Sequence, residues 1–301
     1  MVTKFALNDN ETIVGKIALD FLSGSKTGKI WGITSSGIFI HLRSSIVFLT
    51  NIRYVGPVNI IFNLALPELW KIEDELEINI SDQTINIYHP KYPISIKIKA
   101  IWKTPPKPVS NISNDEQQKR ILAASRQFSL LKNEQGYTSL LLPFVSDKLS
   151  LETDNTWLFS SWNTIKLLKI SMIQKDTESI LSLANLLVGS GRGLTPSGDD
   201  LLTGLTFMRR RWFPDINWMT EVEEQLLTTF KEKTTSVSST LFECAILGEA
   251  DSRIQEMADV LMSMDIPFYH QALELSRWGN SSGADVFLGM LLAIEGFQNH
   301  I

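Results

Sequence analysis

The sequence lacks several features that would assign it to a functional class at once. It has one cysteine, Cys244, so no disulfide can form within the chain, and a reducing cytoplasm is the expected compartment. Its four histidines are scattered, and no cysteine–histidine pair has the spacing of a zinc site. Acidic residues outnumber basic ones by 33 to 28, which argues against a nucleic-acid-binding face.

Long apolar runs are also missing. No stretch approaches the roughly 18 consecutive apolar residues of a membrane span. The N-terminal segment MVTKFALNDNETIVGKIALDFL mixes acids and amides with its apolar residues, so no signal peptide is expected. Because 44% of the residues are hydrophobic and the chain has 301 residues, we expect a soluble, cytoplasmic protein with two domains.

The first hundred residues alternate apolar and polar side chains. This period of two is clear in residues 58–64 (VNIIFNL), 76–80 (LEINI) and 94–99 (ISIKIK), and it is typical of half-buried strands. Turn-forming residues separate these segments. The pattern predicts an antiparallel barrel or sandwich of about six to eight strands.

The period changes after a proline-rich stretch at 104–117. Ile180, Leu183, Ala184 and Leu187 follow helical spacing, and two similar stripes lie within 254–261 and 287–294. The expected fold class is therefore α+β, with a β-rich domain followed by a mostly helical one. The predicted domains are 1–104 (β-rich), 105–117 (linker or long connection) and 118–301 (helical).

The helical region contains a glycine-rich loop, LLVGSGRGLTPSGDDLLTG, at residues 186–204. It is not a dinucleotide-binding motif, because it follows a helical segment and has Leu194 in place of the third glycine. Thr195 and Pro196 suit a helix N-cap followed by a first-turn proline, and the residues from Ser197 onward suit a capping box. At the far end of this predicted helix, the basic run 209–211 would complement the helix dipole.

The start of this helix is repeated later in the chain. SGDDLLTG at 197–204 and SGADVFLG at 282–289 share two glycines, a serine and an aspartate at a constant offset of 85 residues. Two interpretations stay open. The segments are two independently capped helices, or they face each other across one pocket and hold a phosphate or carboxylate on their free N–H groups. In the second case Gly198 and Gly283 would let a ligand approach the backbone, and Arg192 would clamp it.

A third polar segment, KTTSVSST at 233–240, lies between the two repeats. It is either a cap and turn or part of the same pocket. The aspartates allow three roles: capping a helix, holding a magnesium ion that bridges to phosphate, or accepting N–H groups from a substrate amide. Cys244 lies in an apolar segment, and His270 has no partner in a catalytic order, so the sequence offers no clear nucleophile.

These blocks resemble the AllH-type family, in particular the run GSGRGLTPSGDDLLTG at 189–204, TTSVSSTLFECAILG and GNSSGADVFLG. The early stretch SGIFIHLRSSIVFLTN resembles the β-rich N-terminal part of that family. The resemblance implies a subunit of oxamate carbamoyltransferase, which converts oxalurate and phosphate to oxamate and carbamoyl phosphate together with other subunit types. It assigns no catalytic residue, and residues 100–180 match no family segment.

We therefore expect a small anionic substrate (phosphate, carbamoyl phosphate or an oxalurate-like molecule), other protein subunits, no nucleic acid and no membrane. Asp200 and Asp285 are the candidate catalytic residues, and magnesium is the one candidate cofactor, at Asp199, Asp200 and Asp285. The alternatives are a non-catalytic, anion-sensing subunit and a magnesium-dependent kinase-like or hydrolytic enzyme. The candidate substrate-binding residues are Gly191, Arg192, Gly193, Thr195, Ser197, Gly198, Thr234, Thr235, Ser239, Ser281, Ser282 and Gly283.

Overall fold

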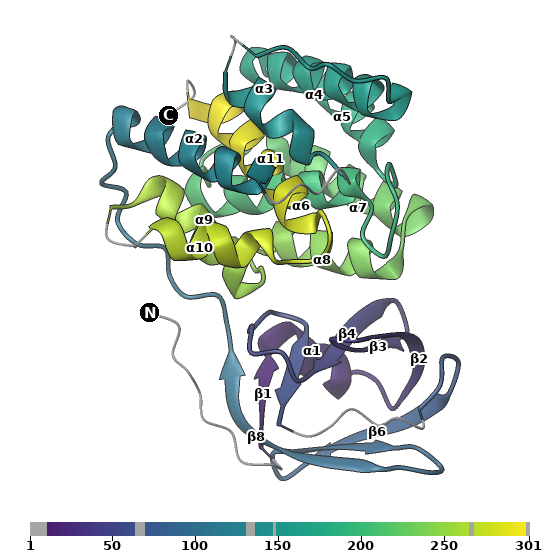
Figure 1. Ribbon diagram of the computed structural model, residues 1–301. Coiled ribbons are helices and arrows are strands. Elements are labelled where there is room, and N and C mark those ends of the chain that lie inside the picture. Colours follow the sequence, from purple (N-terminus) through teal and green to yellow (C-terminus); the bar gives the residue numbers. More distant parts are fainter. Residues whose placement is uncertain (1–10, 64–69, 131–135, 147–148, 265–267, 299–301) are drawn as a thin grey trace. The chain divides into compact units, whose positions relative to one another are not determined.

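The chain forms two compact units, Met1–Pro105 and Pro106–Ile301 (Figure 1). The computed structural model describes residues 11–63, 70–130, 136–146, 149–264 and 268–298. In this part of the chain every strand belongs to the first unit, and the second unit is helical. The predicted fold class is therefore confirmed.

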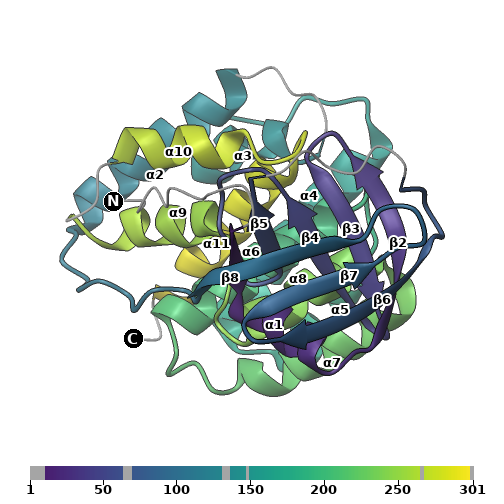
Figure 2. The ribbon, with the colours of Figure 1, turned by 90° about the horizontal axis from the view of Figure 1, so that it is seen from below.

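The first unit is a closed barrel with the strand order β1-β5-β4-β3-β2-β6-β7-β8, and Figure 2 shows β6, β7 and β8 side by side across it. Six of the pairings between described strands are antiparallel, but β1 pairs with β8 and β4 with β5 in parallel. Alternating apolar and polar residues predict a strand but not the direction in which it pairs. Since no hairpin joins either parallel pair, the sequence could not reveal that these two pairings are parallel. The strands are β1 (Glu11–Gly15), β2 (Thr27–Thr34), β3 (Gly37–Leu42), β4 (Ser45–Thr50), β5 (Asn59–Phe62), β6 (Glu75–Ser81), β7 (Thr84–Tyr88) and β8 (Ile94–Trp102).

The alternating segments lie in strands as predicted. In β6, Leu76 and Ile78 point into the barrel core, while Glu75 and Glu77 are exposed. The segment at 58–64 forms β5, which is buried on both faces because Ile61 packs in a second apolar cluster with Ile13 and Val55. Leu64 lies outside the described residues.

A short helix, α1 (Lys16–Ser23), interrupts the β-rich unit and has no counterpart in the sequence prediction. It buries Ile17, Ala18 and Leu22 and follows β1 without a loop. The chain turns at Gly15, where an added Cβ would lie 2.2 Å from the carbonyl oxygen of Gly56. A helix of this length has little periodicity of its own, so tertiary packing determines it.

The second unit consists of helices connected by short loops. Residues 103–113, between β8 and the first helix of this unit, form neither helix nor strand. The three predicted apolar stripes lie in α5, α9 and α11, and most of their residues are buried. The helices are α2 (Asn114–Leu130), α3 (Leu141–Val145), α4 (Thr156–Gln174), α5 (Thr177–Leu187), α6 (Ser197–Trp212), α7 (Met219–Lys233), α8 (Ser236–Ile246), α9 (Ser252–Met262), α10 (Phe268–Ser276) and α11 (Ser282–Phe297).

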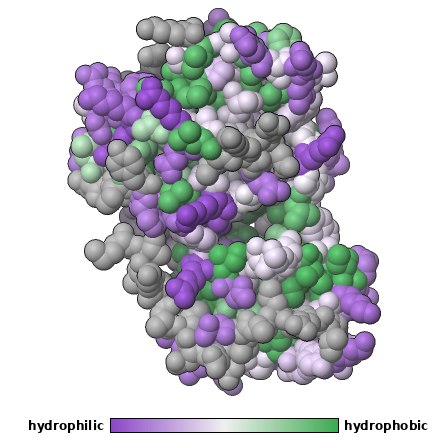
Figure 3. Space-filling model, in the orientation of Figure 1, coloured by the Kyte–Doolittle hydropathy of each residue, from purple (hydrophilic) through white to green (hydrophobic). Residues whose placement is uncertain are grey.

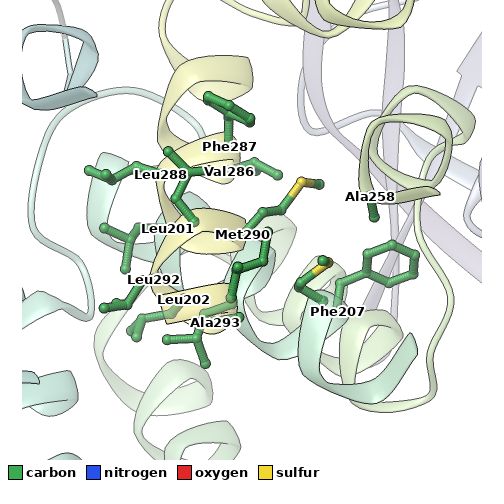
Figure 4. Close-up of a cluster of buried hydrophobic side chains, with 14 of the residues drawn as sticks. Leu201, Leu202, Phe207, Ala258, Val286, Phe287, Leu288, Met290, Leu292 and Ala293 are labelled. Atoms are coloured by element: carbon green, nitrogen blue, oxygen red, sulfur yellow. The ribbon is translucent and has the colours of Figure 1, made fainter. Parts of the chain in front are cut away.

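Helices α6 and α11 form the centre of this unit. They pack against each other more extensively than any other pair of described elements. A helix that is apolar all round belongs in a core, and α11 buries nearly every residue from Gly283 to Phe297. In Figure 4 the side chains of α11 point to several sides of the helix, among them Val286, Phe287 and Met290. The outer helices therefore cover a two-helix core.

The basic run at the end of α6 is buried in ion pairs. Arg209 and Arg210 both bind the carboxylate of Glu223 in α7, and Arg209 is only 1% exposed. Arg211 binds Asp259 in α9, with a distance of 2.7 Å between Nη2 and Oδ2. The sequence predicted that these arginines complement the helix dipole. Their ion pairs also connect α6 to two neighbouring helices. No helix among the described residues is long and apolar enough to cross a membrane.

Candidate functional site

The glycine-rich loop between α5 and α6 folds back on itself. Gly189, Gly191 and Gly193 have φ values of 73°, 121° and 100°, in the region that glycine adopts most readily. The turn brings the N–H of Gly189 to within 2.7 Å of Asp199 Oδ1. The loop therefore supplies a backbone donor to the first turn of the helix that it precedes.

The start of α6 differs from the predicted cap. Pro196 is the N-cap, Ser197 is the first helical residue, and neither Thr195 nor Ser197 caps the helix with its side chain. Thr195 Oγ1 instead donates a hydrogen bond to Asp200 Oδ2 at 3.0 Å. The predicted cap and capping box are therefore wrong, because these side chains face the neighbouring helix start rather than their own N–H groups.

The repeated glycines serve helix packing. An added Cβ at Gly198 would lie 2.0 Å from the Leu187 carbonyl oxygen, and one at Gly283 would lie 1.9 Å from that of Leu275. Their N–H groups are also occupied, by the carbonyl oxygens of Ser190 and Trp278. The prediction that a ligand approaches the backbone at these two glycines is therefore wrong, because a preceding helix already fills that space.

The second glycine of each repeat lies where α6 and α11 touch. An added Cβ at Gly204 would lie 2.1 Å from Val286 O, and one at Gly289 would lie 1.9 Å from Leu201 O. These two contacts are related by the same 85-residue offset as the repeat itself. The two helices therefore pack reciprocally, with each glycine against the backbone of the other helix.

This packing brings the two helix starts together around buried carboxyl groups. Thr195 Oγ1 lies 3.1 Å from Ser282 Oγ at the start of α11. Asp200 is 2% exposed and Asp285 is fully buried. Burial raises the pKa of both groups; the hydroxyl of Ser282 partly offsets this for Asp200, and those of Ser197 and Ser281 do so for Asp285, so each carboxyl group lies near the serine that begins the other helix.

The third carboxyl group, that of Asp199, faces the start of α8. Its Oδ2 accepts a hydrogen bond from Thr234, and Ser238 also lowers its pKa. Thr235 caps α8 by accepting a hydrogen bond from Ser238 N, and its hydroxyl donates to the Leu194 carbonyl oxygen at 2.6 Å. The segment 233–240 therefore contains both a helix cap and a contribution to the carboxyl cluster. Ser239 is buried in the same turn.

Burial is the largest influence on the pKa values of all three carboxyl groups. It raises the pKa of Asp285 to about 7, against the hydrogen bond from Tyr137 N–H. Burial also raises the pKa of Asp200 well above its usual range, and the neighbouring charge of Asp285 acts in the same direction. The pKa of Asp199 is raised as well. Around neutral pH the cluster therefore retains protons, and it can both donate and accept hydrogen bonds.

Two polar atoms of the cluster make no well-formed hydrogen bond to another described residue, although Ser238 lies near Asp199 and the hydroxyls of Ser197 and Ser281 lie near Asp285. The two atoms are Asp285 Oδ2 and Ser238 Oγ, and both are buried. Asp285 Oδ1 by contrast accepts from Tyr137 N–H at 2.6 Å. Because an unpaired buried polar atom is costly, it is a reason to look for a missing partner.

The cluster has an accessible rim. Thr195, Thr234, Ser281 and Ser282 are partly exposed above the buried carboxyl groups. Arg192 and its neighbours Gly191 and Gly193 are exposed on the loop, and no hydrogen bond or ion pair joins the Arg192 side chain to another described residue. The structure therefore brings the two helix starts and Thr234 together, but it does not bring Arg192 into the cluster.

The expected magnesium site is not formed. No group of three or more carboxylate, histidine or cysteine side chains in the described ranges is arranged to hold a metal ion. Asp199 turns toward Gly189 and Thr234, whereas Asp285 turns toward Tyr137. The carboxyl groups are close in space, but they do not converge on one point.

Sequence reasoning missed the segment that covers Asp285. Gly136 has a φ of 64° and packs so closely that an added Cβ would lie 2.6 Å from both carboxyl oxygens. The Tyr137 ring stacks on Trp157 of α4, whose indole N–H donates to Ser190 Oγ at 2.8 Å. A glycine–tyrosine pair outside any periodic pattern gives little signal, so only the fold reveals this contact. Cys244 is buried with a raised pKa, and His270 is exposed, as expected of non-catalytic residues.

These features define a class: a protein with a β-barrel unit and a helical unit that holds buried carboxyl groups where two repeated helix starts meet. The family model described as oxamate carbamoyltransferase subunit AllH matches residues 187–294, from the end of α5 into α11. This match confirms the resemblance to the AllH family over these residues. Searches of the curated proteins and of the solved structures find no match.

Proposed function

We propose that this chain is a subunit of a carbamoyl-transferring enzyme, and that the carboxyl cluster binds its small substrate. The observation that carries the proposal is that the family-matched residues 187–294 contain all three aspartates of the carboxyl cluster and all four rim residues. The reaction implied by the resemblance converts oxalurate and phosphate to oxamate and carbamoyl phosphate. Oxalurate carries amide N–H groups and a carboxylate, and phosphate carries anionic oxygens.

The cluster suits both kinds of group. An ionised carboxylate accepts the N–H groups of an amide or ureide, and the unpartnered Oδ2 of Asp285 is the acceptor in question. Ionised aspartates would repel phosphate or oxamate, but burial raises the pKa of Asp200 well above its usual range, and the charge of Asp285 acts in the same direction. A protonated carboxyl group donates a hydrogen bond instead. The rim hydroxyls of Thr195 and Ser282 add donors for an anionic oxygen.

In the proposed transfer, one bond to the carbamoyl carbon forms and one bond to it breaks. A phosphate oxygen attacks the carbamoyl carbon, the bond from that carbon to the oxamate nitrogen breaks, and the nitrogen takes up a proton. Negative charge develops on the carbamoyl oxygen, where a fixed donor stabilises it best. Protonated Asp200 would serve as that donor, while Asp285 would hold the substrate N–H. Direct transfer requires no protein nucleophile, in keeping with the burial of Cys244.

A second candidate is a regulatory subunit that binds a small anion while a partner performs the chemistry. The observation that favours it is the depth of the carboxyl groups, since Asp199, Asp200 and Asp285 are at most 2% exposed. The two candidates differ for Asp200→Asn in an assembled enzyme. A catalytic role predicts lost turnover with intact assembly, whereas a regulatory role predicts an altered ligand response with an unchanged saturated rate.

The first experiment is thermal unfolding of the purified chain with phosphate, carbamoyl phosphate, oxamate or oxalurate, each with and without magnesium. A ligand at a hundred times its dissociation constant adds about 2.7 kcal/mol to the free energy of unfolding. We expect stabilisation that disappears in Ser282→Ala and Asp285→Asn. The matched control is Ser129→Ala, which removes a part-buried hydroxyl from α2. Stabilisation that survives both site variants would place the ligand elsewhere.

A further inference from the structure

Helix α4 is apolar on both sides. Its inner face buries Leu158, Ile165, Leu168 and Met172. Its outer face carries four large apolar residues with exposed fractions of 53, 52, 46 and 40%, namely Phe159, Leu167, Ile170 and Ile173. At 100° per residue these four lie within an arc of roughly 120°. Single exposed apolar residues are ordinary, but a stripe along one helix is typical of an interaction surface.

In Figure 3, hydrophobic patches alternate with hydrophilic ones at the end of the helical unit that carries α3, α4 and α5 in Figure 1. The helix spans 19 residues, or roughly 28 Å at the usual rise. That length is sufficient for a partner element to pack along it.

The charges of α4 are of one sign. Its sequence, TWLFSSWNTIKLLKISMIQ, contains two lysines and no aspartate or glutamate. Lys169 is neutralised by Glu295 at 2.8 Å. Lys166 is exposed, lies 5.3 Å from the ring centroid of Trp162 and has no ion pair with a described residue. The stripe therefore offers an apolar surface with one uncompensated positive charge.

This charge argues against a second copy of the chain as the occupant. A symmetric dimer brings the same residues of both copies together, and Ile165 is the midpoint of α4. An antiparallel pairing of α4 with its copy would place Lys166 close to the Lys166 of the other copy. Like charges at that distance repel, so a different chain with an acidic side chain fits better.

We propose that the outer face of α4, formed by Phe159, Lys166, Leu167, Ile170 and Ile173, docks another subunit type through an apolar surface that carries an acidic residue opposite Lys166. The inference rests on the proposed function, because the partner is another subunit of the same carbamoyl-transferring enzyme. The face is separate from the carboxyl cluster, and α4 lies outside residues 187–294. The two are connected through Trp157, which contacts both Tyr137 and Ser190. A partner on α4 would therefore bind the helix that also supports the loop over Asp285.

The test is co-expression of the full chain with the other subunit types of its enzyme, followed by size-exclusion chromatography with light scattering. Ile170→Asp places a charge in the middle of the stripe, and we expect it to weaken assembly by at least about 30-fold, as for an interface hot spot. Lys166→Glu should weaken it by about 5-fold. The matched control is Leu247→Asp, which changes an apolar residue of 65% exposure at the end of α8 and should leave assembly unchanged.

A second measurement uses the native helix. A photo-crosslinking amino acid at position 167 should join to the other subunit, whereas the same group at position 247 should not. The inference would be overturned if Ile170→Asp assembled with the other subunits as well as the unaltered chain does. It would also be overturned if this chain alone formed a dimer that Ile170→Asp dissociates. Turnover distinguishes the two proposals: an active complex that assembles without α4 refutes only the docking surface, whereas an inactive complex assembled through α4 refutes the carbamoyl transfer.

Discussion

The starts of α6 and α11 are two versions of one arrangement. Each begins with a serine, packs a glycine against the carbonyl oxygen of a preceding helix, and buries an aspartate one turn later. Each then packs a second glycine against the other helix. The shared residues are thus those that hold the two helices together, and the repeat describes how the core is assembled.

The differences between them lie in the unshared residues. Asp199 of α6 stands where α11 has Ala284, and its carboxyl group binds Thr234, which lies between α7 and α8. At the far end, α6 carries three arginines that are paired with Glu223 and Asp259, whereas α11 carries Glu295, which forms one part-exposed ion pair with Lys169 of α4. The difference shows that buried ion pairs connect α6 to its neighbours, while α11 is held mainly by apolar packing.

The largest effect is expected where α6 differs most from α11. Glu223→Ala would leave Arg209 buried without its partner, which typically costs about 3–5 kcal/mol. The free energy of unfolding from urea denaturation measures this loss. Glu295→Ala, which removes the part-exposed partner of Lys169 on α11, is the matched control and should cost less than about 1 kcal/mol. Equal losses would show that the two helix ends depend on their charges to the same extent.

The next prediction concerns pH. The folded-state pKa of Asp285 is raised from 3.8 to about 7, so the folded chain retains a proton that the unfolded chain releases. For this group, stability is greatest below about pH 4 and falls as the pH rises through 7. Asp285→Asn removes the charge and keeps an acceptor for Tyr137 N–H.

Relative to the unaltered chain, this variant should gain about 3 kcal/mol of stability between pH 5 and pH 8. Thermal or urea unfolding at several pH values measures it. Asp200→Asn should also gain stability relative to the unaltered chain as the pH rises, because burial raises the pKa of Asp200 as well. A constant difference between variant and unaltered chain across this range would contradict a buried, titrating Asp285.

The two packing glycines offer a direct comparison of the helices. Gly204→Ala and Gly289→Ala should each cost about 1–3 kcal/mol, because the added methyl group meets backbone that cannot move aside. If the packing is reciprocal, the two losses are similar, and urea unfolding measures both. Gly32→Ala is the control, since an added Cβ there has its nearest neighbour at 3.7 Å. A large loss at only one of the two glycines would show that the contact is not symmetric.

The smallest effects are expected for the two serines. Ser197→Ala and Ser282→Ala each remove one hydroxyl near a carboxyl group of the other helix, which should cost roughly 0.5–1.5 kcal/mol. Ser282 also contacts Thr195, so its removal should cost slightly more. A double-mutant cycle between Ser282 and Asp200 would measure the coupling, and a coupling of zero would contradict the pairing.

Much of this architecture could be predicted from the sequence. Period-two and helical stripes predicted the β-rich and helical regions, because burial of one face leaves a pattern along the chain. The constant offset suggested that the two serine–glycine–aspartate segments would meet, and the structure places Thr195, Asp200 and Ser282 together. Whether a substrate binds there stays a prediction.

Other features could not be predicted. Gly198 was interpreted as an access point for a ligand, since a missing side chain leaves room equally for a ligand or for another helix, and only the fold shows which one fills it. The contact from Tyr137 to Asp285 joins residues 148 positions apart, without any local pattern. The parallel strand pairs and α1 were missed for a similar reason, because tertiary contacts determine them.

The separation of α6 and α11 along the chain has a consequence for how the protein is made. Every residue between Trp212 and Ser282 must be synthesised before α11 exists, yet α11 is the main partner of α6. Until then, a nascent chain exposes the apolar sides of α6 together with the unpaired glycine surface at Gly204. Contacts of such long range form late and slowly. The helical unit therefore cannot complete its two-helix core until α11 has been synthesised.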